Sequence, residues 1–174
     1  MTKSRVQPTK TLLLILAFAG FMLPGLSVVA TDFQSADKVL VEKGKRKLHL
    51  LRNGKPFRSF DIALGMAPEG HKQEEGDSKT PEGLYRLDAR NPESDFFLSI
   101  HVSYPNAQDR RRAQQKGVSP GGQIMIHGQP NEPSYSAAFY RSNDWTDGCI
   151  AVSNSDMIDI WLMTPDNVPI EIRP

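Results

Sequence analysis

The chain has 174 residues, a length typical of a single domain. Its 21 Lys and Arg residues nearly balance its 20 Asp and Glu residues, for a formal net charge of +1, and the two signs are interspersed. Nucleic-acid-binding domains usually carry a basic patch or stripe, so this balance argues against such a function and no nucleic-acid partner is expected.

The first 30 residues are expected to be a signal peptide. Three basic residues precede an apolar run at residues 11–23, and Val28 and Ala30 occupy the small-residue positions of a cleavage site after Ala30. The run is shorter than the about 20 residues of a membrane-spanning helix, so no integral membrane span is expected after processing. An uncleaved N-terminal anchor is the alternative. In either case the rest of the chain crosses a membrane, which predicts a location in the periplasm or cell envelope.

Cleavage would leave a short leader at residues 31–37 and one domain at residues 38–174. It removes three Lys or Arg residues and no Asp or Glu, so the net charge changes from +1 to −2. The 144 residues after the cleavage site are enough to bury a core without disulfide bonds.

Residues 38–64 are expected to form a three-stranded meander. Strands at residues 38–41 and 48–51 flank a turn at Lys43-Gly44, and Asn53-Gly54 is the strongest short hairpin signal. Residues 57–64 alternate apolar and polar positions and form the partner strand. Its apolar side chains are expected in the core: Phe57, Phe60, Ile62 and Leu64.

Residues 65–83 are a long polar stretch rich in Gly, Pro and charged residues. A loop of this length is uncommon unless it serves a functional site, so we expect it to border one. Strands follow at residues 84–87 and 96–104. Residues 107–116 lack an apolar face and predict a solvated helix or helical loop, whose three consecutive arginines are more typical of a solvated surface than of a polyanion site.

Residues 123–126 predict a strand that ends at His127-Gly128. A helix is predicted at residues 156–163, with Ser155 as its cap. The spacing of its apolar residues predicts one buried stripe, made of Met157, Ile160 and Trp161.

Thr164-Pro165 ends that helix, and residues 168–172 predict a last strand. Pro169 cannot donate a hydrogen bond to a neighbouring strand, so this strand is expected at a sheet edge. The predicted architecture is therefore mainly β, with a few short helices.

Cys149 is the only cysteine, and it follows an export signal. Exported proteins usually pair their cysteines, so a single one is a buried core residue, half of an intermolecular disulfide or a reactive thiol. A thiol attacks carbonyl groups as its thiolate and needs a base or cation nearby. His is the side chain suited to that task near neutral pH.

His127 is the candidate base. A strand that ends in His-Gly places the imidazole at the rim of a sheet, where Gly128 lets backbone or substrate approach closely. Gly148 permits a tight turn before the thiol, from which backbone N–H groups can reach a developing oxyanion. Taken alone, however, a His and a Cys are equally compatible with an inactive core pair.

Four segments in this order resemble the YkuD-type L,D-transpeptidase family. They are Gly76-Asp77 with Thr80-Pro81-Glu82-Gly83-Leu84-Tyr85, then Ser103-Tyr104-Pro105-Asn106, His127-Gly128 and Thr146-Asp147-Gly148-Cys149. The resemblance runs from about residue 38 to the end of the chain. It implies a mainly β fold, either a β-sandwich or a curled sheet, built around a substrate groove.

The resemblance also implies an enzyme that acts on peptidoglycan stem peptides and uses no cofactor and no metal. Cys149 would attack the amide that follows the third-position diamino acid, and D-Ala would leave. An amine would then resolve the thioester as a cross-link or a protein attachment. His127 would be the base, with the Gly128 carbonyl orienting its imidazole. The N–H groups of Gly148 and Cys149 would hold the oxyanion.

The substrate groove is expected to be lined by Trp145, Thr146 and Asp147. Many members of the family have His where this chain has Asp147, and Arg where it has Ala151. A nearby carboxylate raises the pKa of a thiol, and the missing Arg removes a partner for a substrate carboxylate. Residues 144–152 resemble the YafK-like branch, some members of which release proteins from peptidoglycan. Hydrolysis at the same Cys-His site is therefore the alternative activity, with a peptidoglycan-linked envelope protein as a further partner.

Two other classes of function remain open from the residues alone. A zinc peptidase would use the histidines with Asp or Cys, but no His-Glu-x-x-His or His-x-His pair occurs. A non-catalytic peptidoglycan-binding module would keep the groove without turnover. The remaining histidines are expected to be structural in strands (His49 and His101) or solvated in the long polar stretch (His71).

Overall fold

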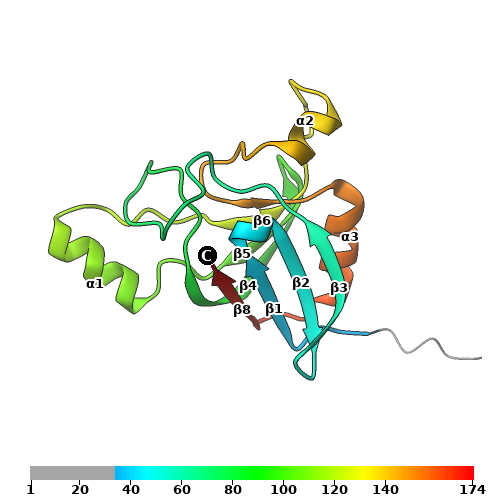
Figure 1. The fold of residues 1–174 in the computed structure, drawn as a ribbon, viewed down its shortest axis with the longest axis horizontal. Helices are drawn as coiled ribbons and strands as arrows, with labels where there is room; N and C mark the ends of the chain where they lie inside the picture. The colour runs from blue at the N-terminus through cyan, green and yellow to red at the C-terminus, as the bar shows by residue number, and fades with distance from the viewer. Residues whose placement is uncertain (1–33) are drawn as a thin grey trace, which may run out of the picture. The chain divides into compact units, whose positions relative to one another are not determined.

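The computed structural model describes residues 34–174, so the expected signal peptide at residues 1–30 lies outside the described residues. The described chain forms one eight-stranded sheet in the order β3-β2-β1-β8-β4-β5-β6-β7, with three α-helices (Figure 1). The strands are β1 (Lys38–Glu42), β2 (Lys47–Arg52), β3 (Lys55–Asp61), β4 (Gly83–Ser94), β5 (Phe97–Val102), β6 (Met125–His127), β7 (Ile150–Ala151) and β8 (Val168–Arg173). The helices are α1 (Ala107–Lys116), α2 (Ala137–Ser142) and α3 (Asn154–Met163), and a 3-10 turn spans Lys43–Lys45. The predicted mainly β architecture is confirmed.

The first three strands form the predicted antiparallel meander. β1 pairs with β2, and β2 pairs with β3. Asn53 (φ 53°) and Gly54 (φ 74°) both have positive φ, the geometry of a two-residue hairpin turn whose twist matches that of its strands. The third strand ends at Asp61, earlier than predicted, because residues 63–65 leave β3 and pair elsewhere.

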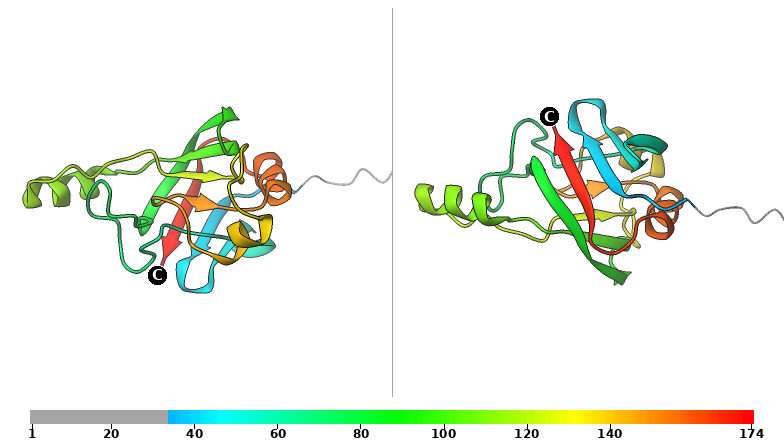
Figure 2. Two further views of the ribbon diagram at one scale, coloured as in Figure 1. Left: turned by 90° about the horizontal axis from the view of Figure 1, so that it is seen from above. Right: turned by 90° about the horizontal axis from the view of Figure 1, so that it is seen from below.

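Those three residues draw the two ends of the sheet together. Ala63 forms a bridge to Ala151 of β7, and Gly65 forms one to Thr146. Since β3 and β7 are the outermost strands of the sheet order, these bridges require the sheet to curl on itself, as the two views in Figure 2 show. The curled alternative of the predicted fold is the one observed.

The prediction that the last strand lies at an edge is wrong. β8 lies inside the sheet, between β1 (parallel) and β4 (antiparallel). Pro169 is tolerated because the pairing with β1 begins only at Ile170, so the missing N–H of Pro169 interrupts no bond of that ladder.

Other elements differ from their predictions in detail. β4 is much longer than residues 84–87, and neither α2 nor β7 was predicted. The cap of α3 is Ser153, whose hydroxyl accepts from the N–H of Asp156 at 3.1 Å, rather than Ser155. Trp161 is only half-buried and packs against the core from outside, where the Arg90 guanidinium lies 4.8 Å from its ring centroid.

The core lies within the curl of the sheet and is covered on one side by α3, which packs against β5. Its fully buried side chains include Val39, Leu50, Ile126, Ile150 and Ile170. Burying one such Leu or Ile stabilises the fold by about 1.5–3 kcal/mol. None of the helices in residues 34–174 is long and apolar enough to span a membrane.

Candidate active site

The pairing of β6 with β7 brings the two candidate catalytic residues together. Ile126 and Ile150 are partners in this parallel pair, and both are fully buried in the core. His127 follows Ile126 and Cys149 precedes Ile150. The buried pair of β6 and β7 therefore positions both side chains. Both line a cleft of about 480 Å³.

The His127 imidazole is buried and held in one tautomer. Its Nδ1 lies 2.7 Å from the carbonyl oxygen of Gly128. A carbonyl oxygen can only accept, so Nδ1 carries the proton and Nε2 keeps its lone pair. Burial lowers the pKa of His127 to about 4, against the opposing effect of the Gly128 bond. The ring is therefore neutral near pH 7 and able to accept a proton.

Gly128 is required by close packing behind this histidine. A Cβ at this position would lie 2.5 Å from Oδ1 of Asn154 and 3.0 Å from Cβ of Phe97. Its N–H donates to the carbonyl of Phe96 at 3.0 Å. The close approach predicted at this glycine is thus made by other parts of the chain.

The Cys149 thiol is partly buried and protonated near neutral pH. It donates to the carbonyl oxygen of Gln123 at 3.5 Å. Burial raises the pKa of Cys149, and the Asp147 carboxylate raises it further. A backbone hydrogen bond at Met125 and the charge of Lys72 act in the opposite direction. The effect predicted for Asp147 is therefore confirmed in direction.

The turn before Cys149 is closed by Thr146. The N–H of Gly148 donates to Oγ1 of Thr146 at 3.2 Å, and that hydroxyl donates to the carbonyl of Cys149 at 2.8 Å. Thr146 lines the cleft, but its buried hydroxyl is occupied in bracing the turn. The Gly148 N–H is likewise already engaged, so holding an oxyanion there requires its bond to Thr146 to open.

Residues 65–83, here called the long loop, press against this turn from one side. Gly148 has φ 128°, and a Cβ on it would lie 2.6 Å from the carbonyl oxygen of Lys79. The N–H of Lys79 is held by Asp77 at 3.1 Å, and Asp77 also accepts from the buried ammonium of Lys72 at 2.8 Å. The long loop borders the site, as predicted, through a buried ion pair.

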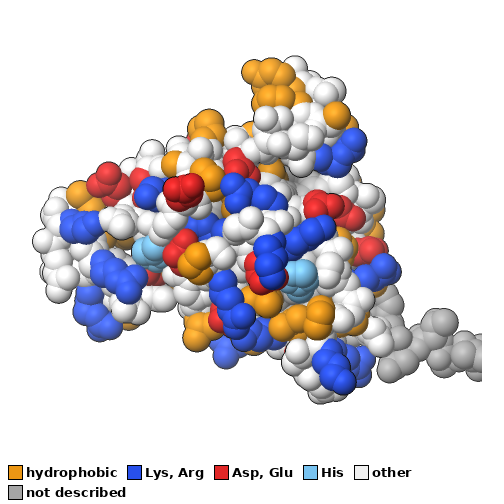
Figure 3. Space-filling view, in the orientation of Figure 1, with side chains coloured by type: hydrophobic (Ala, Val, Ile, Leu, Met, Phe, Trp, Pro, Cys, Tyr) orange, Lys and Arg blue, Asp and Glu red, His pale blue; other side chains and the backbone are white. Residues whose placement is uncertain are grey.

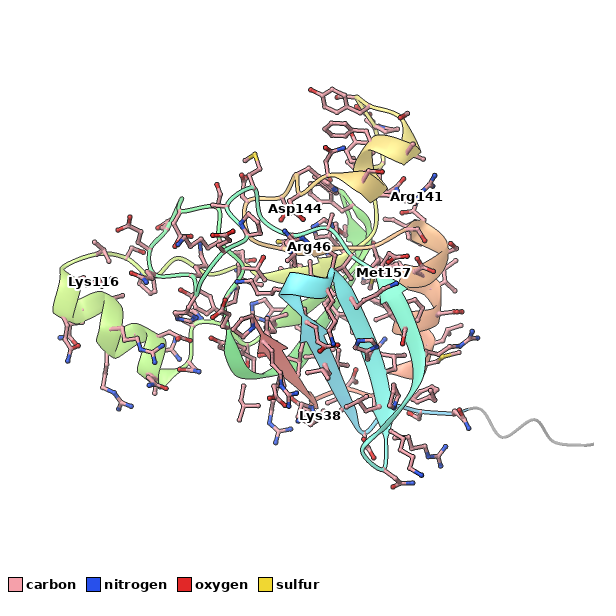
Figure 4. All side chains as sticks on the ribbon, in the orientation of Figure 1. Lys38, Arg46, Lys116, Arg141, Asp144 and Met157 are labelled. Atoms are coloured by element: carbon pink, nitrogen blue, oxygen red, sulfur yellow. The ribbon has the colours of Figure 1, made fainter. Side chains whose placement is uncertain are left out.

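A second ion pair fixes the start of the cysteine segment. Asp144 accepts from Nε of Arg46 on both carboxylate oxygens at 3.0 Å, from Nη2 of Arg46 at 2.6 Å and from the N–H of Leu64 at 2.9 Å. Arg46 and Asp144 lie side by side in Figure 4, where the residues after β3 pass the segment that leads to Cys149. Charge-assisted bonds of this kind fix orientation as well as adding stability.

Aromatic rings form a wall of the cleft around His127. The ring centroids of Phe96 and Trp145 lie 4.7 and 5.6 Å from that of His127 and 5.9 Å from each other. Trp145 was predicted to line the groove, and Asp147 lies exposed at the same cleft.

Phe96 was missed as a site residue. It lies at the turn between β4 and β5, which Asn131 holds through bonds to the carbonyl of Ser94 (2.9 Å) and the N–H of Phe97 (3.0 Å). Phe96 was the first residue of the strand predicted at residues 96–104, and that position carried no signal for a place in the cleft.

The other histidines lie outside the cleft. His71 was predicted to be solvated, but its Nδ1 accepts from the N–H of Glu82 at 2.9 Å and its Nε2 lies 3.2 Å from the buried carboxylate of Asp109. It therefore fastens the long loop to α1. His49 contacts Ser59 through one ring nitrogen and Glu42 through the other. His101 bonds Asp88, so both of these histidines have partners within the fold. In residues 34–174 no group of three His, Cys, Asp or Glu side chains lies close enough together to hold a metal ion.

Comparison with known proteins agrees with the fold and the motifs. The model of the YkuD family, described as the L,D-transpeptidase catalytic domain, matches residues 36–172. Among curated sequences, the chain is 38% identical over 96 residues to the Escherichia coli (strain K12) protein named "Putative L,D-transpeptidase YafK". That alignment covers 52% of this chain and 37% of YafK, so the chain spans well under half of that relative.

Solved structures share the fold. The helical cell shape determining protein Pgp2 of Campylobacter jejuni is 28% identical with a TM-score of 0.61, and the match covers 78% of this chain and 46% of Pgp2. Bd1075 of Bdellovibrio bacteriovorus is 24% identical with a TM-score of 0.55, over 81% of this chain and 51% of Bd1075. An L,D-transpeptidase of Mycobacterium smegmatis is 13% identical with a TM-score of 0.52, over 79% of this chain and 58% of its own.

Proposed function

Because this chain belongs to the L,D-transpeptidase catalytic domain family, we propose that it is an exported cysteine acyltransferase that acts on peptidoglycan stem peptides through a thioester on Cys149, with His127 as the base. One observation supports this most directly. A neutral imidazole with a free Nε2 lone pair and the only thiol of the chain line the same cleft.

The protonation states favour base-assisted attack over a preformed ion pair. Burial lowers the pKa of His127 to about 4 and raises that of Cys149, so both groups are neutral near pH 7. The thiol would turn from the carbonyl of Gln123 toward Nε2 of His127. As Sγ bonds to the substrate carbonyl carbon, its proton would pass to the imidazole.

The rest of the cycle follows from proton balance. The tetrahedral intermediate collapses, the C–N bond breaks, and the leaving amine takes the proton from His127. A thioester remains on Cys149. An acceptor amine then attacks the thioester and gives its proton to His127, and Sγ leaves and is reprotonated. With water as the acceptor, the same steps amount to hydrolysis.

Hydrolysis is the second candidate, and the charge of the cleft favours it. No Lys or Arg lines the cleft within residues 34–174, so the terminal carboxylate of a tetrapeptide donor has no cationic partner there. Ala151 is buried against Ala63 and does not line the cleft. A scissile bond to the side chain of a linked protein would present no such carboxylate, so release of a peptidoglycan-linked protein competes with cross-linking.

The decisive experiment is mass spectrometry of peptidoglycan fragments after incubation with the purified protein, residues 31–174. A tetrapeptide muropeptide and a fragment that carries a protein-derived Lys amide should be offered together. Loss of D-Ala with a cross-linked dimer identifies transpeptidation, and release of the Lys peptide identifies hydrolysis.

Cys149→Ser is the matched control for this experiment. A hydroxyl lacks the acidity and nucleophilicity of the thiol, so this variant should fold normally and leave both substrates intact. Product formation by Cys149→Ser, or no product and no thioester adduct with the wild-type chain, would overturn the proposed function.

Export is the other part of the proposal. Cleavage after Ala30 follows from the short apolar run and the small residues before the site. N-terminal sequencing of the protein recovered from the cell envelope should begin at Thr31. An intact N-terminus on the mature protein would instead favour an anchor.

A further inference from the structure

The cleft that holds Cys149 is lined by unpaired negative charge. Glu93, Asp95 and Asp147 all line it and are all exposed. Within residues 34–174, none of these three carboxylates has a hydrogen bond or an ion pair. No Lys or Arg lines the cleft in the same part of the chain, so the charged side chains of its lining are acidic.

Three carboxylates outside the lining of the cleft are, by contrast, paired with cations. Asp144 is paired with Arg46, Asp77 with Lys72, and Glu82 with Lys43. Unmatched like charges in one concave site repel each other, and a cation that enters the site relieves that repulsion. The three unpaired acids of the cleft therefore lie where a ligand can reach them.

The aromatic wall points independently to the same kind of ligand. The Phe96 ring, 37% exposed, lies 5.9 Å from the ring of Trp145 at the same cleft. Aromatic faces attract ammonium groups, and carboxylates beside such faces add a direct partner for the charge. Ser99, only 3% exposed, also lines the cleft, and its hydroxyl has no hydrogen-bond partner among residues 34–174, which leaves one more polar group for a bound donor.

We propose that Glu93 and Asp95, together with Phe96 and Trp145, form a subsite for a primary ammonium group carried by the peptide substrate. The inference rests on the proposed function, and it deepens it by naming the charge that the cleft selects. The ammonium group is either the free side-chain amine of the stem diamino acid or an amine of a lysine-linked peptide. Asp147 stands apart from this subsite because it adjoins the thiol.

The test measures binding without turnover. Cys149→Ala should be titrated with a stem tetrapeptide muropeptide and with the same compound acetylated on its side-chain amine. A fragment linked to lysine, with and without acetylation of the lysine α-amine, distinguishes the second source. We expect acetylation of the recognised amine to weaken binding about tenfold at low salt, and the difference to shrink as ionic strength rises.

Variants of Glu93 and Asp95, here called the acidic rim, separate the effect of charge from that of shape. Glu93→Gln with Asp95→Asn, in the Cys149→Ala background, should abolish the preference for the free amine while binding the acetylated ligand as before. Asp61→Asn is the matched control, because Asp61 is an exposed carboxylate on β3 that does not line the cleft. It should keep the full preference.

The possible outcomes distinguish failure of the subsite from failure of the proposed function. Equal binding of free and acetylated ligands, with muropeptides still bound, would overturn the subsite and leave the proposed function standing. A preference that survives in the double variant would do the same. Failure of every muropeptide to bind Cys149→Ala would overturn both.

Discussion

Two segments flank the turn before Cys149, and they are held in opposite ways. The long loop is fastened from inside: Lys72 bonds Asp77 and the carbonyl of Glu74, and Lys43 bonds the carbonyls of Gly70 and Thr80. Residues 129–143, here called the α2 segment, leave most side chains exposed (Figure 3 shows hydrophobic groups gathered at the tip around α2).

The α2 segment touches the site through aromatic rings and through the hydrogen bonds of Asn131 to the turn between β4 and β5. Tyr140 lies 5.0 Å from Trp145 between ring centroids, and Nε1 of Trp145 donates to the carbonyl of Tyr140 at 3.2 Å. Tyr135 stacks on Phe139 at 4.3 Å and is 60% exposed. These contacts carry no buried charge.

The difference teaches how backbone without regular structure can be as fixed as a sheet. Buried N–H and carbonyl groups must be paired, and in the long loop buried lysine and aspartate side chains do this work. Gly148 packs directly on that loop, so the position of the thiol depends on it. The opposite side, with the acidic rim and the α2 segment, stays open to a ligand.

The largest effect is expected from a change at His127. His127→Ala removes the proposed base and should lower turnover by about two to four orders of magnitude. It should also slow alkylation of Cys149 near neutral pH. Since the pKa of His127 is lowered to about 4, kcat/KM of the wild-type enzyme should keep its base-dependent rate down to about pH 4 instead of losing it near pH 6.5. An unchanged alkylation rate in His127→Ala would place the base elsewhere.

Lys72→Met should destabilise the long-loop side by about 3–5 kcal/mol. The change keeps an unbranched side chain but leaves the Asp77 carboxylate without its buried cation. Urea unfolding measures the free energy, and iodoacetamide alkylation reports the turn through the reactivity of Cys149.

Lys116→Met is the control for that variant. Lys116 lies on α1, exposed, and its ammonium bonds only the side chain of Gln73 (Figure 4). Removing an exposed charge should cost less than about 1 kcal/mol. Equal losses in the two lysine variants would refute the claim that the long loop is held by its buried ion pair.

Much of this arrangement could be predicted from local patterns in the sequence. The rest could not, because it depends on pairing between residues far apart in the chain. Asn53-Gly54 and the strand ending at His127 carry their own signals in the chain. Pro169 misled because strand order is set by partners far away in sequence, and β8 enters its parallel pairing one residue later. Lys72 gave no sign of burial, since lysine is ordinarily exposed.

The acidic rim was missed for a similar reason. Glu93 lies at the far end of β4, which continues well beyond its apolar start, and Asp95 lies in the turn that follows. The charged composition of that end resembles a loop. Its position at the cleft depends on the bulged pairing with β5 and on the bonds from Asn131, neither of which leaves a local pattern.

Asp147→Asn should have a smaller effect than Lys72→Met, and it should shift the pKa of the Cys149 thiol in the opposite direction. Burial raises the pKa of Cys149 most, the Asp147 carboxylate raises it further, and the charge of Lys72 lowers it. Removing the carboxylate lowers the thiol pKa and increases the thiolate fraction at a fixed pH. Alkylation at pH 7–8 should become a few-fold faster, the scale of an exposed charge interaction of about 0.2–1 kcal/mol.

The pH profile supplies the check on that prediction. Above the pKa of both forms the thiol is fully ionised, so the two alkylation rates should converge. Glu132→Gln, an exposed acid on the α2 segment, should leave the profile unchanged. If Asp147→Asn also leaves it unchanged, burial alone sets the reactivity of the thiol.

The smallest effect is expected at the tip of the α2 segment. Tyr135→Ala removes a ring that is mostly exposed, stacks on Phe139 and lies edge-on to Tyr140, so the free energy of unfolding should fall by about 0.5 kcal/mol. Hydrogen exchange should show faster exchange of α2 amides, while the amides of Gln73 and Lys79, which donate to Asp77, keep their protection. Alkylation of Cys149 should not change, because nothing in the turn packs on Tyr135. A slower alkylation, or lost protection in the long loop, would mean that the two sides are coupled and that the contrast between them is wrong.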